Sequence, residues 1–301
     1  MINFNFGEIS NVVVSTALGH YGLGMFPYLF DSDYIRLIRL MKESRTTVLT
    51  KSGTRFRRKG NFRLLFPWTW KYIKKIPNFG ILNAYGLTNF GVLINVRGLS
   101  LSGRFGIDFI PNIYPEFSRG TKTAINQVIE VIGMYKKVLQ KHLWAVELNF
   151  SCPNSTEAIT RNTLSGKECI KAVEKKFPYL IVIVKASIVH PVETIQEWER
   201  AGASAYHCIN TIDFSLLFSA TSPLSRVGGG GVSGGPTTEM AFKHNQEIRK
   251  HVQRPMIFGC GVMDETQVKR CLDAGADAVS ICSLVSYDPS KAMKVIKKYN
   301  L

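Results

Sequence analysis

Long apolar runs and a secretion signal are both missing from this 301-residue sequence. The longest apolar stretches, such as Tyr179–Val184, are far shorter than the roughly 20 residues that a membrane-spanning helix needs. Met1 is followed by a mixed stretch and not by a basic region with an apolar core, so no signal peptide is recognised. We therefore expect no membrane span and a cytoplasmic location.

Cysteines are few and scattered, and none forms a CxxC pair. Disulfide frameworks belong to small secreted chains, and zinc or iron–sulfur sites need clustered cysteines. We therefore expect no metal, and several cysteines are expected to be small core residues. A special role for any one of them must come from its neighbours. The six are Cys152, Cys169, Cys208, Cys260, Cys271 and Cys282.

Acidic side chains are in short supply: 22 Asp and Glu stand against 38 Lys and Arg, a formal charge of +16. Such an excess suits RNA, an anionic membrane, an acidic partner or phosphorylated ligands, and a solvated basic surface explains it equally well. The basic clusters at Arg55–Lys59 and Lys71–Lys75 are not interleaved with a nucleic-acid-binding motif. We expect no nucleic-acid partner.

Strand-like β-branched runs alternate with helical stretches along most of the chain. Asp264, and Asp288 followed by Pro289, are typical of helix N-termini. The predicted strands lie near 11–17, 46–51, 106–113, 144–151, 180–186, 205–210, 255–260 and 278–283. The predicted helices lie near 31–44, 121–141, 166–177, 191–201, 237–252, 264–274 and 288–299.

Eight strands that are mostly too apolar to be half exposed predict a parallel sheet covered by helices. This count predicts an α/β fold, the (β/α)8 TIM barrel, over one domain of residues 1–301. An open doubly wound sheet is the alternative, but no GxGxxG follows the first strand. Residues 53–105 do not fit the repeat, and we interpret them as long inserted loops over the C-terminal mouth.

The fourth strand ends in an unusual way, in the stretch VELNFSCPNS. A buried run from Val146 to Phe150 leads directly to Cys152, and Pro153 then prevents extension. Asn149 and Asn154 flank the thiol, and a buried amide must be satisfied, so we expect their partners to be bound ligands and not core groups.

The other strand ends bring lysines and asparagines to the same rim, because functional groups of a barrel gather at the carboxyl ends of its strands. No carboxylate pair falls there, which disfavours glycosidase chemistry and carboxylate-built metal sites. His207 lies inside the sixth strand and is interpreted as a core or supporting residue. A cysteine nucleophile with a histidine partner stays open on residue types alone.

Small residues near the end of the chain predict a phosphate site. Glycine lets backbone N–H groups approach phosphate oxygens, and phosphate sites of barrels follow the seventh and eighth strands. The glycine run could instead be a flexible loop. The stretches concerned are Gly228–Gly235, Gly259–Gly261 and Cys282-Ser283.

In their order along the chain, these motifs resemble the dihydroorotate dehydrogenase family of FMN-dependent barrels. The segment Glu147–Asn154 is close to the most specific signature of that family, and Gly80–Asn89 is similar to its LNxxGLxN loop. The remaining matches are Val48–Ser52, Arg58–Asn61, Val182–Lys185, Ile209–Thr211, Gly230–Gly234 and the ending DAGADAVSICS at 273–283.

The resemblance implies that Cys152 removes the C5 proton of dihydroorotate while a hydride leaves C6 for FMN N5. A thiol suits this role because its pKa lies nearer to the working pH than that of a serine hydroxyl. Lys185 would lie at the flavin N1/O2 edge, where negative charge develops. The implied substrate contacts are Asn83, Asn149, Asn154, Asn210 and Thr211. The implied FMN contacts are Ala17, Lys51, Ser52, Asn112, Asn149, Lys185, Gly231, Ser233, Gly234, Gly259, Gly261, Cys282 and Ser283.

Three departures from the family pattern bear on this assignment. A proline–glycine pair usually follows the position of Asn154, but here the loop reads Ser155–Ala158. Val262 and Cys282 replace residues that are usually glycine or serine. Cysteine at 152 marks the soluble class, whereas Asn112 is more similar to the serine-containing, membrane-associated class.

Two other functions remain open alongside pyrimidine biosynthesis. A tRNA dihydrouridine synthase-like FMN enzyme would also use a cysteine, but it would carry a histidine–arginine pair where this chain has Asn210-Thr211. A flavin-binding subunit without turnover is the second. We expect a homodimer that uses fumarate directly, with quinone and NAD as the open alternatives. Without a nicotinamide motif, NAD would require a separate iron–sulfur/FAD electron-transfer subunit.

Overall fold

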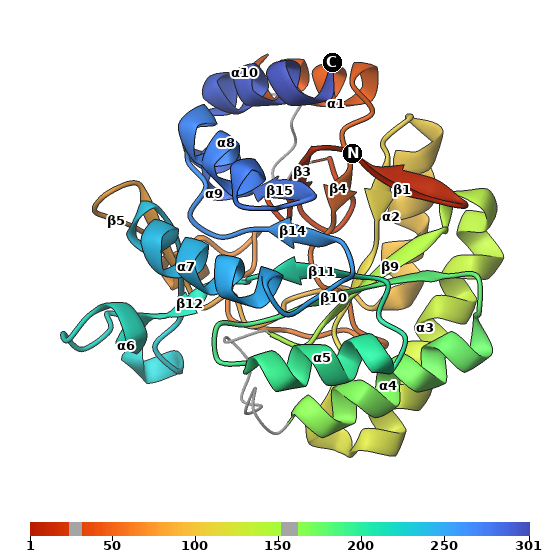
Figure 1. Cartoon of the computed structure of the whole chain (residues 1–301). Helices are drawn as coiled ribbons and strands as arrows, with labels where there is room; N and C mark the ends of the chain where they lie inside the picture. Colours follow the sequence, from red (N-terminus) through yellow and green to blue (C-terminus); the bar gives the residue numbers. More distant parts are fainter. Residues whose placement is uncertain (24–31, 152–161) are drawn as a thin grey trace.

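The computed structural model describes residues 1–23, 32–151 and 162–301. In this part of the chain, parallel strands form a barrel surrounded by helices, as predicted (Figure 1). The sheet has the order β7-β4-β3-β15-β14-β11-β10-β9-β8. β7 and β8 are two halves of the third strand, divided at Pro111, which has no N–H to donate. The two ends of the sheet therefore meet, and the barrel is nearly closed.

All eight predicted strands are present at the predicted places. The barrel strands are β3 (Val12–Ser15), β4 (Val48–Leu49), β7 (Phe109–Ile110), β8 (Asn112–Ile113), β9 (Ala145–Asn149), β10 (Ile181–Lys185), β11 (Ala205–Cys208), β14 (Met256–Phe258) and β15 (Ala278–Ile281). The helices that follow them are α1 (Ser32–Glu43), α2 (Val92–Arg104), α3 (Thr121–Leu139), α4 (Asn162–Lys176), α5 (Val192–Arg200), α7 (Thr238–Arg249), α8 (Glu265–Asp273) and α10 (Pro289–Asn300). Asp264 and Asp288 cap α8 and α10 by accepting from Gln267 N and Lys291 N.

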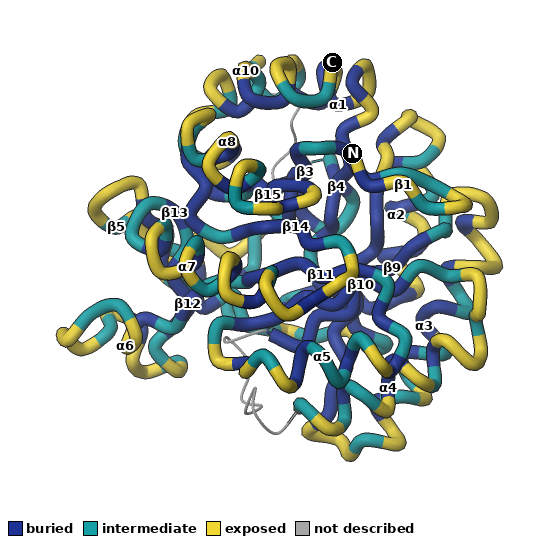
Figure 2. Tube along the Cα trace, viewed as in Figure 1, coloured by how far each residue is buried: buried dark blue, intermediate teal, exposed yellow. Residues whose placement is uncertain are grey.

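The lower half of the barrel interior is filled by apolar side chains, with one contributed by each of the eight strands. An N-terminal hairpin of β1 (Ile2–Phe4) and β2 (Gly7–Ile9) closes this end, and its Ile2 and Ile9 pack onto the layer. The layer consists of Val13, Leu49, Ile110, Ala145, Ile183, Ala205, Ile257 and Ala278. Successive side chains of a strand face opposite sides, so the same strands turn their other apolar residues toward the helices. Figure 2 shows the strands buried and the outer faces of the helices exposed.

The interpretation of residues 53–105 as loops alone was wrong. The helix α2 occupies 92–104 and completes the repeat between the second and third strands. Two strands before it, β5 (Ile73–Ile76) and β6 (Gly80–Asn83), join β12 (Ile212–Asp213) and β13 (Gly231–Gly234) in a separate antiparallel sheet. β5, β12 and the short helix α6 (Phe214–Leu217) lie together to one side of the barrel in Figure 1. The sequence carried no direct signal for this pairing, because it joins segments more than a hundred residues apart.

Within the glycine run, Gly231–Gly234 form the strand β13 of this sheet. Gly234 has φ +86°, and a Cβ there would lie 2.3 Å from the carbonyl oxygen of Phe79. Only glycine therefore allows β13 to approach the turn before β6 this closely. Among the described helices, none is long and apolar enough to cross a bilayer.

The closure of the barrel by the hairpin of β1 and β2 can be tested by a stability measurement. Ile9 is fully buried against the apolar layer, so Ile9→Ala should lower the free energy of unfolding by about 2–5 kcal/mol. Denaturant unfolding measures this change. Asn3→Ala in the same hairpin is the control; Asn3 is exposed, and its replacement should change stability by less than about 0.5 kcal/mol. Equal effects of the two substitutions would show that the hairpin does not seal the barrel.

Candidate active site

A cavity of about 400 Å³ opens at the carboxyl ends of the barrel strands. Its walls come from the barrel interior, from β5 and β6, and from the segment after β15. The lining side chains are mainly small, polar or basic. They belong to Ser15, Thr16, Ala17, Lys51, Ser52, Ile73, Lys75, Ile81, Asn83, Tyr85, Leu87, Thr88, Asn149, Lys185, His207, Ile209, Asn210, Thr211, Ser233, Cys260, Ser280, Cys282, Ser286 and Tyr287.

The cavity floor follows from the two-residue period of the strands. Two residues beyond each member of the apolar layer, the chain again reaches an inward-facing position. All eight of these positions carry a polar residue or glycine: Ser15, Lys51, Asn112, Glu147, Lys185, His207, Gly259 and Ser280. The barrel interior therefore changes from apolar to polar within one layer, and the ligand cavity lies above this change.

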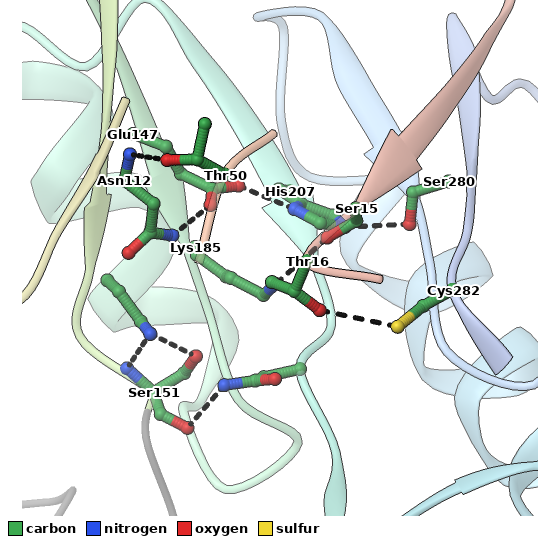
Figure 3. A network of polar contacts seen from close by, with 12 residues as sticks. Ser15, Thr16, Thr50, Asn112, Glu147, Ser151, Lys185, His207, Ser280 and Cys282 are labelled. Atoms are coloured by element: carbon green, nitrogen blue, oxygen red, sulfur yellow. Dashed lines mark hydrogen bonds and ion pairs between the residues drawn. The ribbon is translucent and has the colours of Figure 1, made fainter. Parts of the chain in front are cut away.

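Within the polar layer, Glu147 on β9 is the central acceptor (Figure 3). It is fully buried, with 0% of its surface exposed, and its Oε1 lies 2.6 Å from Nδ1 of His207. Asn112 Nδ2 donates to the other carboxylate oxygen, Oε2. On its far side, His207 Nε2 lies 2.8 Å from Ser280 Oγ. Three strands thus contribute to one continuous chain, Glu147–His207–Ser280.

Charge holds this layer together. Burial alone would raise the pKa of Glu147, but the positive charge of Lys185, the neighbouring His207 and the hydrogen bond from Asn112 outweigh it and leave the pKa below its usual range. Burial and the charge of Lys185 lower the pKa of His207 against the opposing effect of Glu147. Near neutral pH the carboxylate is therefore ionised and the imidazole is neutral. Lys185 itself donates to Ser15 Oγ at 3.3 Å.

Asn149 begins a second chain along the rim. Its Nδ2 donates to Ser52 Oγ at 2.9 Å, and its Oδ1 accepts from the backbone N–H of Ser151 at 3.0 Å and from Ser151 Oγ at 2.9 Å. Asn210 Nδ2 donates to the carbonyl of Ser151 at 3.3 Å. The expectation that Asn149 finds its partners only in ligands was wrong, because its carbonyl oxygen already serves to fix the residue that precedes Cys152.

The structure brings ten of the predicted site residues to the cavity wall: Ala17, Lys51, Ser52, Asn83, Asn149, Lys185, Asn210, Thr211, Ser233 and Cys282. Asn112 lies beneath, in the polar layer. Gly231, Gly234, Gly259, Gly261 and Ser283 are not part of the wall, although Ser283 Oγ donates to Ser233 Oγ at 2.9 Å. Cys152 and Asn154 lie outside the described residues, as does the loop Ser155–Ala158.

Sequence reasoning missed several wall residues. Lys75 and Ile73 of β5 reach the cavity through the antiparallel sheet, which was not predicted. Tyr85 lies under the Lys51 ammonium, whose Nζ is 3.6 Å from the ring centroid. Ser280 in the wall, and Glu147 in the polar layer beneath it, could have been found from their spacing, because each stands two residues beyond an apolar inward position.

Among the described cysteines, Cys260 and Cys282 reach the cavity. Burial raises the pKa of the Cys260 thiol to about 12, against the smaller lowering effect of its hydrogen bond to Thr237. Cys260 therefore stays protonated at neutral pH and is a poor candidate for a base. Cys282 Sγ lies 3.3 Å from Thr16 Oγ1.

Comparison with known proteins gives a consistent result. A model of the dihydroorotate dehydrogenase family matches residues 36–299. The dihydroorotate dehydrogenase B (NAD(+)) catalytic subunit of Bacteroides thetaiotaomicron is 27% identical, over 98% of this chain and 91% of that protein. The protein of the same description from Halalkalibacterium halodurans is 32% identical, over 70% of this chain and 68% of the relative.

Solved structures show the same fold. The ligand-free dihydroorotate dehydrogenase of Eimeria tenella superposes with a TM-score of 0.73 at 16% identity, covering 97% of this chain and 83% of that one. Its complex with ferulenol gives a TM-score of 0.71 at 17% identity, covering 95% of this chain and 79% of that one.

Gly259 tests whether the polar layer is as tightly packed as described. A Cβ at this position would lie 2.4 Å from Ser280 Oγ and 2.8 Å from His207 Nε2. Gly259→Ala should therefore displace both groups and lower the free energy of unfolding by about 1–3 kcal/mol, measured by denaturant titration.

The matched control is Gly133→Ala in the middle of α3, where a Cβ meets nothing within 4 Å. Alanine is the better helix former, so this variant should gain about 0.5–1 kcal/mol. A Gly259→Ala protein as stable as the parent would show that the polar layer is not tightly packed around Gly259.

Proposed function

Because this chain belongs to the dihydroorotate dehydrogenase family, we propose that residues 1–301 form one FMN-binding barrel domain that oxidises dihydroorotate to orotate in pyrimidine biosynthesis, with Cys152 as the base. The observation that carries the proposal is the position of Cys152 in the chain. It directly follows Ser151, which the rim asparagines Asn149 and Asn210 hold at the carboxyl end of β9, beside the cavity.

The cavity fits a flavin. Lys185 and Lys51 offer positive charge to the electron-rich edge of a ring, and the Lys51 ammonium already lies on an aromatic face. In the described part of the cavity wall, Thr211 Oγ1 is a buried side-chain oxygen without a hydrogen-bond partner. Such atoms are costly unless a ligand satisfies them. FMN, when bound, supplies the N5 atom that accepts the hydride leaving C6 of the substrate.

The phosphate of FMN would lie near the small residues after β13 and β15. Ser233 and Cys282 line this part of the cavity, and Ser283 supports Ser233. We propose that Gly231, Gly234, Gly259, Gly261 and Ser283 belong to the same phosphate region through their backbone N–H groups. The helix α9 (Ser283–Tyr287) begins there.

The substrate would bind above the flavin, against the amides. A ring with alternating N–H and C=O groups is matched by asparagine side chains, which offer a donor and an acceptor together. Asn83, Asn210 and Thr211 line the cavity on the side of β6 and β11, and we propose Asn149 and Asn154 as further contacts. Cys152 removes the C5 proton and keeps it until it is released to solvent.

The two rival functions have weaker support. A tRNA-modifying flavoenzyme is disfavoured because the family model and the two curated relatives described above are named for dihydroorotate dehydrogenase. A flavin-binding subunit without turnover is disfavoured by the retention of Cys152 together with a complete polar layer around Lys185.

We propose NAD as the final electron acceptor, reached through a second, electron-transfer subunit. The names of the curated relatives, catalytic subunits of NAD(+) enzymes, favour NAD over the fumarate expected from sequence. The surface fits an acidic partner: between Glu43 and Asp108 the chain holds no Asp or Glu but twelve Lys and Arg. Exposed aromatic residues lie in the same segment, among them Trp68 (65% exposed) and Phe79 (68% exposed). A homodimer of this subunit is part of the proposal.

Anaerobic addition of dihydroorotate tests the main function. The flavin absorbance of the purified protein should bleach, because the substrate delivers a hydride. Cys152→Ala should slow this bleaching by at least about 100-fold, the typical contribution of a positioned base. Stopped-flow absorbance measures the rate.

Cys271→Ala is the control, since Cys271 lies in α8 and not in the cavity wall. Its bleaching rate should equal that of the parent. An unbleached flavin in the parent protein would refute the function, and an unchanged rate in Cys152→Ala would refute the base.

The partner proposal predicts salt-sensitive association. Protein isolated from its native cells at low salt should bring with it an acidic subunit that supports NAD reduction, and about 0.5 M NaCl should release that subunit because salt screens surface charge. The isolated chain should then lose activity with NAD. Full NAD activity of the isolated chain, or equal activity with fumarate, would contradict this assignment.

A further inference from the structure

Besides the residues assigned above, the cavity floor contains a buried chain of three groups that the proposed reaction does not use. Ser280, His207 and Glu147 follow one another at hydrogen-bond distance, 2.8 Å and then 2.6 Å. All three side chains are at least 95% buried, and both Ser280 and His207 line the cavity. In a serine, histidine and carboxylate arranged in this order, the imidazole can take up a proton from the hydroxyl, while the carboxylate orients the ring and stabilises the imidazolium.

The partners fix the direction of each hydrogen bond. An ionised carboxylate only accepts, so Nδ1 of His207 carries the proton that points to Glu147. Nε2 of a neutral imidazole is then an acceptor, and Ser280 must donate to it. In this state the Ser280 hydroxyl proton is held in the hydrogen bond to His207 Nε2, and only the lone pairs of the Ser280 oxygen face the cavity.

We propose that the hydrogen-bonded series Ser280–His207–Glu147 is a proton relay. His207 takes up one proton when a negative charge enters the cavity, and the Ser280 hydroxyl thereby becomes a donor toward that charge. The transfer balances without any electron moving. A proton from bulk water reaches Ser280 Oγ through the cavity while Ser280 passes its own proton to His207 Nε2. Serine stays neutral, the imidazole becomes an imidazolium, and the new O–H of Ser280 points outward.

The charges that face His207 explain why the uptake depends on the cavity. They are the Glu147 carboxylate on β9 and the Lys185 ammonium on β10. These two charges compensate each other, so an additional positive charge on His207 is not stabilised until a negative charge develops beside Lys185. A new anion beside Lys185 cancels the repulsion that keeps the imidazole neutral, and Glu147 then stabilises the imidazolium at 2.6 Å.

Gly259 provides the space for this arrangement. Its missing side chain is what allows Ser280 Oγ and His207 Nε2 to meet above β14, since a Cβ would lie within 3 Å of both atoms. The relay is thus a built feature of three strands and not an accidental contact.

The inference rests on the proposed function only in that the bound ligand is a flavin, whose reduction brings negative charge into the cavity. The experiment therefore uses dithionite as the reductant and not dihydroorotate. Failure of dihydroorotate to bleach the flavin would refute the function, whereas the dithionite experiment would still test the relay.

The first readout is the protonation state of His207 in the holoprotein. The chain has six histidines, so labelling with ¹⁵N-histidine gives a small set of signals, and His207→Asn identifies the one that matters. In the oxidised protein at pH 7 the His207 nitrogens should show one protonated and one unprotonated atom. After reduction both should be protonated. Unchanged His207 signals would overturn the proposal.

The second readout is the number of protons taken up on reduction, measured with an indicator dye in weak buffer. The parent should take up about one proton more per flavin than His207→Asn does, because the imidazole is the storage group. Glu147→Gln should likewise take up about one proton fewer per flavin than the parent, since an amide cannot stabilise the imidazolium. If Glu147→Gln does not fold, the comparison of the parent with His207→Asn decides alone.

A second histidine–glutamate pair supplies the matched control. His251 Nε2 lies 3.1 Å from Glu247 Oε1 on the exposed surface of α7 and the turn after it, outside the cavity wall. His251→Asn should take up as many protons on reduction as the parent. Equal uptake by the parent and His207→Asn would refute the relay.

Discussion

The constraint on which the site depends is one buried negative charge. Glu147 sits in the middle of the barrel with no contact to solvent, and an uncompensated carboxylate there would cost several kcal/mol. Asn112, His207 and the charge of Lys185 compensate it from the neighbouring strands. In satisfying the carboxylate, these residues are held in fixed positions, and Lys185 at the cavity wall is among them.

The polar layer that contains this buried charge separates an apolar lower half of the barrel from an upper half that holds the cavity. Below it, one apolar residue from each strand fills the interior, and the N-terminal hairpin seals the end. Above it, the strands end in small and polar residues that leave a cavity. Packing free energy is gained in the lower half, so the upper half can hold polar groups whose remaining partners come from a bound ligand. The rim chain through Asn149 and Ser151 then fixes the point at which Cys152 follows.

Much of this organisation could be predicted from the sequence, because barrel strands are short, apolar and regularly spaced. Their ends located Lys51, Asn149, Lys185 and Asn210 at one rim, and the structure confirms it. The helix at 92–104 and the antiparallel sheet were missed, since weakly periodic helices and pairings between distant segments leave little local signal. Spacing alone marks Glu147 as an inward-facing residue, but its role as the common acceptor was missed because the partners Asn112 and His207 lie on other strands.

A crystal structure of the purified protein with orotate would test the central claim most directly. It should show a flavin in the cavity next to Lys185 and above the polar layer, with orotate stacked on it, held by the rim asparagines and reached by the sulfur of Cys152. A cavity that holds no flavin, or an orotate bound away from Cys152, would contradict the account.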